Sequence, residues 1–191
     1  MNGTRAAPAR AIAAMDRLLE PRTAFALLLA ASVAILGTAL ASQYLGGLDP
    51  CVLCLWQRYP YAVVIGLAGV GLGLAAVSGM PRAMLAGLAG AVALAFLANA
   101  GIAGFHVGVE QHWWEGTQGC AAAGGPAGSV EELRRRLLET EVARCDEVAF
   151  SLLGISMAGY NLIASVILGA FAAGAARVML RGARTAGARH G

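Results

Sequence analysis

The sequence predicts an all-α integral membrane protein, an antiparallel bundle of four helices with all four cysteines in the two loops at one end. Three observations support this fold class. Of the 191 residues, 58% are hydrophobic and 13% are charged, about half the charged fraction of a typical soluble domain. The apolar residues gather in four runs, each about as long as the roughly 20 residues that a helix needs to cross a bilayer. Most of the arginines gather at one end of these runs. Nothing in this composition indicates binding to nucleic acid.

The predicted spans follow the apolar runs in order and lie within a membrane domain of residues 23–180. They are residues 23–45, 58–80, 83–109 and 149–175, joined at one end by loops 46–57 and 110–148, with tails 1–22 and 181–191 at the other. The first run could instead be a signal peptide, because Arg17 and Arg22 precede it and Ala39-Leu40-Ala41 resembles a cleavage site. That leader would be unusually long, and its apolar run continues through the site, so we expect an uncleaved span.

The distribution of arginine predicts the orientation in the membrane. Nine of the 14 basic residues, all of them arginine, lie in the N-terminal tail, in the short turn between the second and third spans, or after the end of the fourth span. Basic residues near the membrane favour the cytoplasmic side. Both termini should therefore be cytoplasmic. The four cysteines should then lie outside, in a compartment where disulfides persist: Cys51, Cys54, Cys120 and Cys145.

The second loop contains a predicted short amphipathic helix between Cys120 and Cys145. Ser129 and Glu132 have the spacing of a capping box, and apolar residues recur behind them at helical spacing as far as residue 138. This helix could pack on its own domain or lie along the outer membrane surface. The small size of the loops offers little soluble domain to pack against, which favours the membrane surface.

The first loop contains the strongest local motif, Cys51-Val52-Leu53-Cys54. Asp49 is suited to cap a helix and Pro50 to occupy its first position, so both cysteines should lie in the first turns of a helix. The unpaired N–H groups there favour a thiolate. Arg58 follows the second cysteine by four residues, so its cation should share that face and stabilise the thiolate or a reduced electron acceptor. Pro60 predicts a break between this turn and the second span.

The cysteines have less reactive interpretations as a zinc site or as inert structural disulfides. Zinc would need a second closely spaced pair, but Cys120 and Cys145 are far apart, with no histidine at metal-ligand spacing beside either. We therefore expect no metal. A disulfide within Cys-x-x-Cys closes so small a loop that it contributes little stability, which favours redox chemistry. Arg58 has an alternative role as an interfacial anchor.

Polar residues in the third and fourth spans are further candidates. His106 lies near the outer end of the third span and is a candidate cofactor contact, the alternative being an interfacial histidine whose partners are all within the protein. Glu110 lies one turn further out. The GxxxG pattern of Gly104 and Gly108 favours packing within the bundle over dimerisation. Two deeper residues should join helices by hydrogen bonds: Asn99 and Asn161.

Together, these motifs resemble the DsbB family of disulfide-bond formation proteins. The resemblance rests on the Cys-Val-Leu-Cys motif with Arg58, on residues 145–150 leading into residues 153–157, and more loosely on residues 104–110 with Trp113-Trp114. It covers about residues 23–169. A protein of this family would be a multi-pass protein of the bacterial inner membrane with its cysteines on the periplasmic side.

The resemblance implies reoxidation of a soluble periplasmic DsbA-like dithiol oxidase, with electrons passed to membrane quinone, either ubiquinone or menaquinone. It implies that the partner's thiolate attacks Cys120 and releases Cys145 from a Cys120–Cys145 disulfide. Cys145 then exchanges with Cys51 and frees Cys54 as the thiolate facing quinone. It further implies that Arg58 stabilises this thiolate and the reduced quinone. No role carries over to Gln57, because that position varies in the family.

Two other functions remain open at this point. A quinone reductase of the vitamin K epoxide reductase type also joins a Cys-x-x-Cys to a four-helix bundle, but there the motif is expected near the end of the last span. Here the motif opens the second span. The chain could also be a structural four-span protein whose loop disulfides brace a binding surface.

Overall fold

The computed structural model describes residues 17–117, 120, 129–131, 134 and 144–187. Its elements, in chain order, are five helices and one short hairpin among these residues. They are α2 (Pro21–Tyr44), α3 (Val52–Trp56), α4 (Arg58–Ala75), α5 (Arg82–Glu110), β1 (Ser151–Leu152), β2 (Ile155–Ser156) and α7 (Met157–Gly187).

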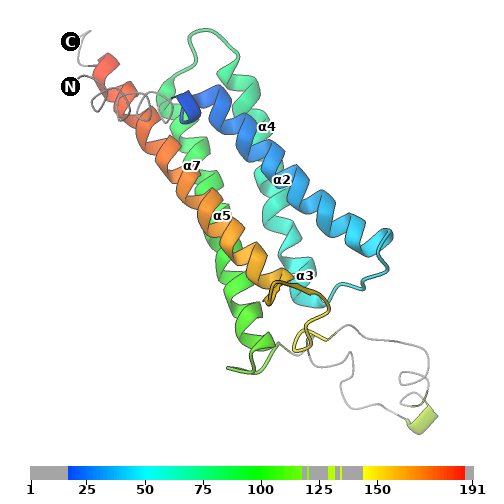
Figure 1. The fold of residues 1–191 in the computed structure, drawn as a ribbon. Helices are drawn as coiled ribbons and strands as arrows, with labels where there is room; N and C mark the ends of the chain where they lie inside the picture. Colours follow the sequence, from blue (N-terminus) through cyan, green and yellow to red (C-terminus); the bar gives the residue numbers. More distant parts are fainter. Residues whose placement is uncertain (1–16, 118–119, 121–128, 132–133, 135–143, 188–191) are drawn as a thin grey trace, which may run out of the picture.

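Among the described residues, four helical segments are long and apolar enough to cross a membrane, which confirms the predicted fold class. They are Pro21–Tyr44, Val52–Ala75, Arg82–Glu110 and Met157–Thr185. Figure 1 shows α5 and α7 side by side along most of their length, with α2 and α4 forming a second pair. The start of α2 and the end of α7 lie at the same end of the bundle, while α3 and the hairpin lie at the other, which we call the cysteine end (Figure 1).

The second span begins earlier and ends earlier than the sequence predicted. Helix α3 ends at Trp56 and α4 begins at Arg58, so the break expected from Pro60 is present. Pro60 lies in the first turn of α4, where a missing N–H is tolerated. Helix α4 ends at Ala75 rather than at residue 80, because the chain turns through Gly79, whose φ is +81°. Arg22 completes this end by donating to the carbonyls of Ala75 (3.0 Å) and Ala76 (3.1 Å).

The fourth span begins at Met157, so the predicted start at residue 149 is wrong. Residues 151–156 form an antiparallel hairpin that pairs Ser151 with Ser156 and Leu152 with Ile155. Its two turn residues, Leu153 and Gly154, have φ of 53° and 79°, the signature of a two-residue hairpin turn. The apolar composition of this segment gave no sign of the turn. Ser156 then caps α7 by accepting a hydrogen bond from the N–H of Gly159 (3.1 Å).

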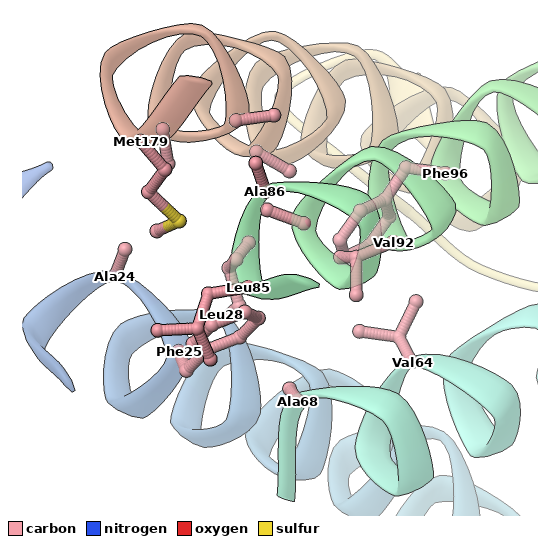
Figure 2. Close-up of a cluster of buried hydrophobic side chains, with 14 of the residues drawn as sticks. Ala24, Phe25, Leu28, Val64, Ala68, Leu85, Ala86, Val92, Phe96 and Met179 are labelled. Atoms are coloured by element: carbon pink, nitrogen blue, oxygen red, sulfur yellow. The ribbon is translucent and has the colours of Figure 1, made fainter. Parts of the chain in front are cut away.

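The bundle core lies between all four spans. Phe25 and Leu28 of α2 gather beside Leu85 of α5, and Met179 of α7 extends toward this group (Figure 2). Val64 and Ala68 of α4 complete the core from the other side, facing Val92 and Phe96 of α5. Small residues allow this close packing. A Cβ added to Gly71 would lie 2.5 Å from the ring of Phe25, and one added to Gly169 would lie 3.2 Å from Cβ of Phe96.

The glycine pattern in α5 is used within the chain. A Cβ on Gly108 would collide with the indole of Trp114 at 2.0 Å, and one on Gly104 would lie 3.9 Å from Leu162 of α7. The expectation of packing inside the bundle is thus confirmed. The predicted amphipathic helix of the second loop lies mostly outside the described residues. Within it, Val130, Glu131 and Arg134 have helical backbone.

We expect Gly71→Ala to lower the free energy of unfolding by about 1–3 kcal/mol, because the added methyl must displace the fully buried ring of Phe25. Gly73→Ala is the matched control, since nothing lies within 4 Å of a Cβ at that position. Unfolding of both variants by a denaturing detergent, followed by circular dichroism, measures the difference. Equal stability of the two variants would contradict the packing of α2 against α4 described here.

Candidate functional site

All four cysteines meet in one buried cluster at the cysteine end. Cys51 and Cys54 come from the start of α3, whereas Cys120 and Cys145 both come from the second loop. Leu53 and Val109 pack among them and exclude water. Cys51 is 5% exposed, Cys120 3% and Cys145 0%. Segments nearly 100 residues apart in sequence are therefore brought to one point.

The four sulfurs form two pairs. Cys120 and Cys145 are joined in a disulfide, with their Cα atoms 5.0 Å apart and a sequence separation of 25. Cys51 and Cys54 are free thiols whose sulfurs lie 2.9 Å apart and share a hydrogen bond. Two sulfurs this close can form a disulfide with little movement of the backbone. The cluster thus holds one oxidised and one reduced pair side by side.

The first helical turn of α3 is built around the Cys51 sulfur. Cys51 is the N-cap, and its sulfur accepts a hydrogen bond from the backbone N–H of Cys54 (3.3 Å). The prediction that Asp49 caps this helix is wrong, since Asp49 is exposed and the helix begins two residues later than expected. The physical reason is that the Cys51 sulfur accepts the backbone N–H that the side-chain oxygen of an ordinary N-cap residue would accept. The reactive atom is therefore also the capping atom.

His106 is buried beside this sulfur. The ring is 3% exposed, and its Nε2 lies 3.6 Å from Sγ of Cys51. The same nitrogen lies 3.9 Å from a carboxylate oxygen of Glu110, one turn along α5. Glu110 in turn accepts a hydrogen bond from the hydroxyl of Ser156 (2.5 Å), which ties α5 to the start of α7. Two acceptors, a sulfur and a carboxylate, thus face one edge of the imidazole.

Hydrogen bonds to Cys51 favour its thiolate. The contact with the Cys54 thiol has the largest effect, and the backbone N–H of Cys54 and the ring of His106 act in the same direction. Burial opposes them, since it disfavours the charged form. The sum lowers the pKa of Cys51 to about 4. In the reduced pair, the negative charge therefore lies on Cys51, with Cys54 as the thiol that donates to it.

Arg58 lies at the first position of α4 and is half-buried. Its Nη1 donates to Oε1 of Gln43 at 2.6 Å, so the guanidinium is held against the end of α2. Within the part of the chain that the structure describes, no hydrogen bond or ion pair joins Arg58 to Cys54. The positive charge of Arg58 still lies only four residues after Cys54 in the sequence.

Gln57, to which the sequence assigned no role, contacts His106 directly. Its Nε2 lies 2.8 Å from Nδ1 of the ring, and its side chain is 7% exposed. Asn161 of α7 donates to the other end of the same amide. Asn161 also accepts from Tyr61 (2.5 Å) and Asn99 (3.3 Å), which confirms that Asn99 and Asn161 join helices. A glutamine at the end of a hydrophobic run was the available signal for this contact.

Cys51, Cys54 and His106 also form a possible ligand set for a metal ion, because their ligand atoms lie within 4.8 Å of one another. Two thiolates and an imidazole are typical zinc ligands. Such a site would require Nε2 of His106 to be free of its proton, and it would exist only in the reduced state of the pair.

Comparison with known proteins identifies the family of the chain. The family model described as disulfide bond formation protein DsbB matches residues 21–175 of the chain. The chain belongs to the DsbB family. It is therefore a multi-pass membrane protein of disulfide bond formation, and its resemblance to this family is confirmed. No solved structure matches the chain significantly.

Curated relatives of the chain include proteins described as disulfide bond formation protein B and one that is uncharacterized. A disulfide bond formation protein B from Stutzerimonas stutzeri is 31% identical over 157 residues, which cover 77% of this chain and 89% of the relative. One from Herminiimonas arsenicoxydans is 38% identical over 82 residues, 43% of this chain and 48% of the relative. An uncharacterized protein of Rickettsia prowazekii is 24% identical over 143 residues, 74% of this chain and 79% of the relative.

We expect the reduced Cys51–Cys54 pair of this DsbB-family protein to hold a thiolate on Cys51 above a pH of about 4 and to lose it as the pH falls through that value. Cys54→Ala removes the hydrogen bond that lowers the pKa of Cys51 most, so this pKa should rise toward the ordinary thiol value of about 8.5. The measurement is thiolate absorbance in the ultraviolet across pH, with Cys120 and Cys145 replaced by serine. A Cys51→Ala control should lack the acidic step. A wild-type pair without that step would contradict the hydrogen bonding described.

Proposed function

We propose that this protein reoxidises a periplasmic DsbA-like dithiol protein and passes the electrons to membrane quinone. The observation that supports this most strongly is the single buried cluster in which a Cys120–Cys145 disulfide lies beside a close Cys51–Cys54 pair. Two inert brace disulfides have no need to lie together, whereas two pairs that exchange electrons must come within bonding distance of each other.

The electron route follows from thiol–disulfide exchange. The partner's thiolate attacks Cys120 and breaks the Cys120–Cys145 bond, so that Cys145 leaves as a thiolate. With Cys51 and Cys54 oxidised, Cys145 attacks Cys51 and frees Cys54. While Cys51 is joined to Cys145, Cys54 is the free sulfur of its pair. Cys54 is also less buried than Cys51, and so it is the better placed of the two to face an acceptor.

The residues around this sulfur suit a quinone, an apolar ring with carbonyl oxygens that accept hydrogen bonds. Leu55, Trp56 and Tyr59 follow Cys54 closely in sequence and are 40%, 46% and 69% exposed, so they offer apolar and aromatic side chains near it. Arg58 lies within the same turn and carries N–H donors and a positive charge. When bound, a quinone supplies an acceptor for two electrons and two protons. Arg58 would hold it, whereas both ring nitrogens of His106 already face protein groups.

The proposed orientation places the cysteine end in the periplasm and both termini in the cytoplasm of a bacterial inner membrane. The arginine distribution supports it. Arg22 and Arg82 lie at the starts of α2 and α5, and Arg181 lies near the end of α7. These helix ends are opposite the cysteine end (Figure 1), as expected for the cytoplasmic side. A DsbA-like partner would reach the Cys120–Cys145 disulfide from the periplasm.

We expect Cys120→Ser to block oxidation of the partner while Cys51 and Cys54 remain oxidisable by quinone, because only the first exchange is lost. Cys54→Ser should abolish quinone-dependent oxidation altogether. The measurement is mixed-disulfide trapping of a DsbA-like protein on each variant, with thiols counted by alkylation. Adducts that form mainly at Cys54 would reverse the proposed direction of electron flow. Wild-type turnover in Cys54→Ser would rule out a role for this pair.

We expect Arg58→Ala to weaken the apparent affinity for quinone by about tenfold to a hundredfold, the cost of losing a charged hydrogen bond. Expression and insertion should change little, since an arginine at the interface is not needed to hold the bundle together. Arg58→Lys should retain part of the affinity if charge alone matters, and none if the planar fork matters. Arg181→Ala, an exposed arginine at the opposite end, is the control. Unchanged quinone dependence in Arg58→Ala would reduce Arg58 to a membrane anchor.

A further inference from the structure

The polar groups beneath the reduced pair form one continuous chain of hydrogen bonds. Tyr61 donates to Oδ1 of Asn161, and Nδ2 of Asn161 donates to Oε1 of Gln57. Nε2 of Gln57 then meets Nδ1 of His106 at 2.8 Å, and Nε2 of His106 faces Sγ of Cys51 at 3.6 Å. The chain runs from Tyr61, in the first turns of α4, to the reactive sulfur and joins α4, α5 and α7.

Every link in this chain has the same direction. An amide nitrogen can only donate and an amide oxygen can only accept. Because Gln57 presents its NH₂ group to the ring, Nδ1 of His106 must accept, and a neutral ring then carries its hydrogen on Nε2. That hydrogen points at two acceptors, the Cys51 sulfur and the Glu110 carboxylate.

The opposite direction is disfavoured at both ends. Reversal would require Gln57, Asn161 and Asn99 to turn their amides together. It would place the NH₂ group of Asn99 where its buried oxygen now lies without a partner, leaving donors unpaired in a dry core. At the other end, an unprotonated Nε2 would face a thiolate and a carboxylate, and lone pairs would oppose negative charges.

We infer that Gln57 and Asn161 are positioning residues whose amides hold His106 in the tautomer that directs its Nε2–H at the Cys51 sulfur. The importance of this contact for catalysis rests on the proposed function. Whenever Cys51 is released from a disulfide, it takes the electron pair of the broken S–S bond, and the Nε2–H stabilises the resulting thiolate. The same tautomer leaves Nε2 without a free lone pair, so the arrangement opposes zinc binding by Cys51, Cys54 and His106.

Nuclear magnetic resonance of the full-length reduced protein in nanodiscs tests the inference without any turnover. Histidine side chains are labelled with ¹⁵N, and the other two histidines, His112 and His190, are replaced by glutamine so that only His106 reports. We expect the proton on Nε2 and an Nδ1 that accepts a hydrogen bond. Gln57→Met should remove the hydrogen-bond shift at Nδ1. Gln111→Met makes the same change at an exposed position and should leave the signals unchanged.

The rate of quinone-dependent dithiol oxidation supplies the second measurement. We expect Gln57→Met to slow it about tenfold or more, as for loss of a group that assists proton placement, and Gln111→Met to leave it unchanged. A proton on Nδ1 in the wild type would overturn the inference. So would wild-type ring signals and a wild-type rate in Gln57→Met. An inactive wild type with the expected ring signals would instead contradict the proposed function and leave the tautomer assignment standing.

Discussion

The site depends on the contacts of the Cys51 sulfur with Cys54 and His106. The backbone N–H of Cys54 donates to it and thereby starts α3. His106, held on α5, lies 3.6 Å away on another side. The Cys120–Cys145 disulfide packs in the same buried cluster. Helix geometry, charge stabilisation and access to the second cysteine pair thus all depend on the position of one atom. Moving this sulfur would change all three at once.

The membrane bundle makes such a site possible because its polar groups have few partners other than each other. Inside an apolar bundle, an unpaired donor or acceptor is costly, so side chains pair across helices. Tyr61, Asn99, Asn161 and Ser165 do so between α4, α5 and α7. The close α5–α7 packing, in which Gly169 meets Phe96, aligns these groups. The resulting network ends at Gln57 and His106, and so the rigidity of the bundle is transmitted to the reactive sulfur.

Composition and spacing were enough to predict the four spans and the cysteine motif, because both are local properties of the chain. The hairpin at residues 151–156 was missed, since an apolar segment of that length suits a helix as well as a strand. Cys51 as the helix cap was missed because sulfur is an uncommon capping acceptor. The contact between Gln57 and His106 spans 49 residues of sequence, and only the packing of α4 against α5 creates it. The partner of Arg58, Gln43, likewise depends on how α2 meets α4.

The central claim is that the four cysteines are two redox pairs that deliver electrons to quinone. The most direct test is anaerobic reduction of the purified protein, addition of measured amounts of a soluble ubiquinone or menaquinone analogue, and counting of thiols by alkylation and mass spectrometry. We expect one quinone to consume two thiols, first at Cys51 and Cys54. The thiols of Cys120 and Cys145 should then exchange with the new Cys51–Cys54 disulfide, and a second quinone should consume the two thiols that this exchange leaves at Cys51 and Cys54. Four thiols that persist after quinone addition, or two disulfides that resist reduction throughout, would contradict the claim.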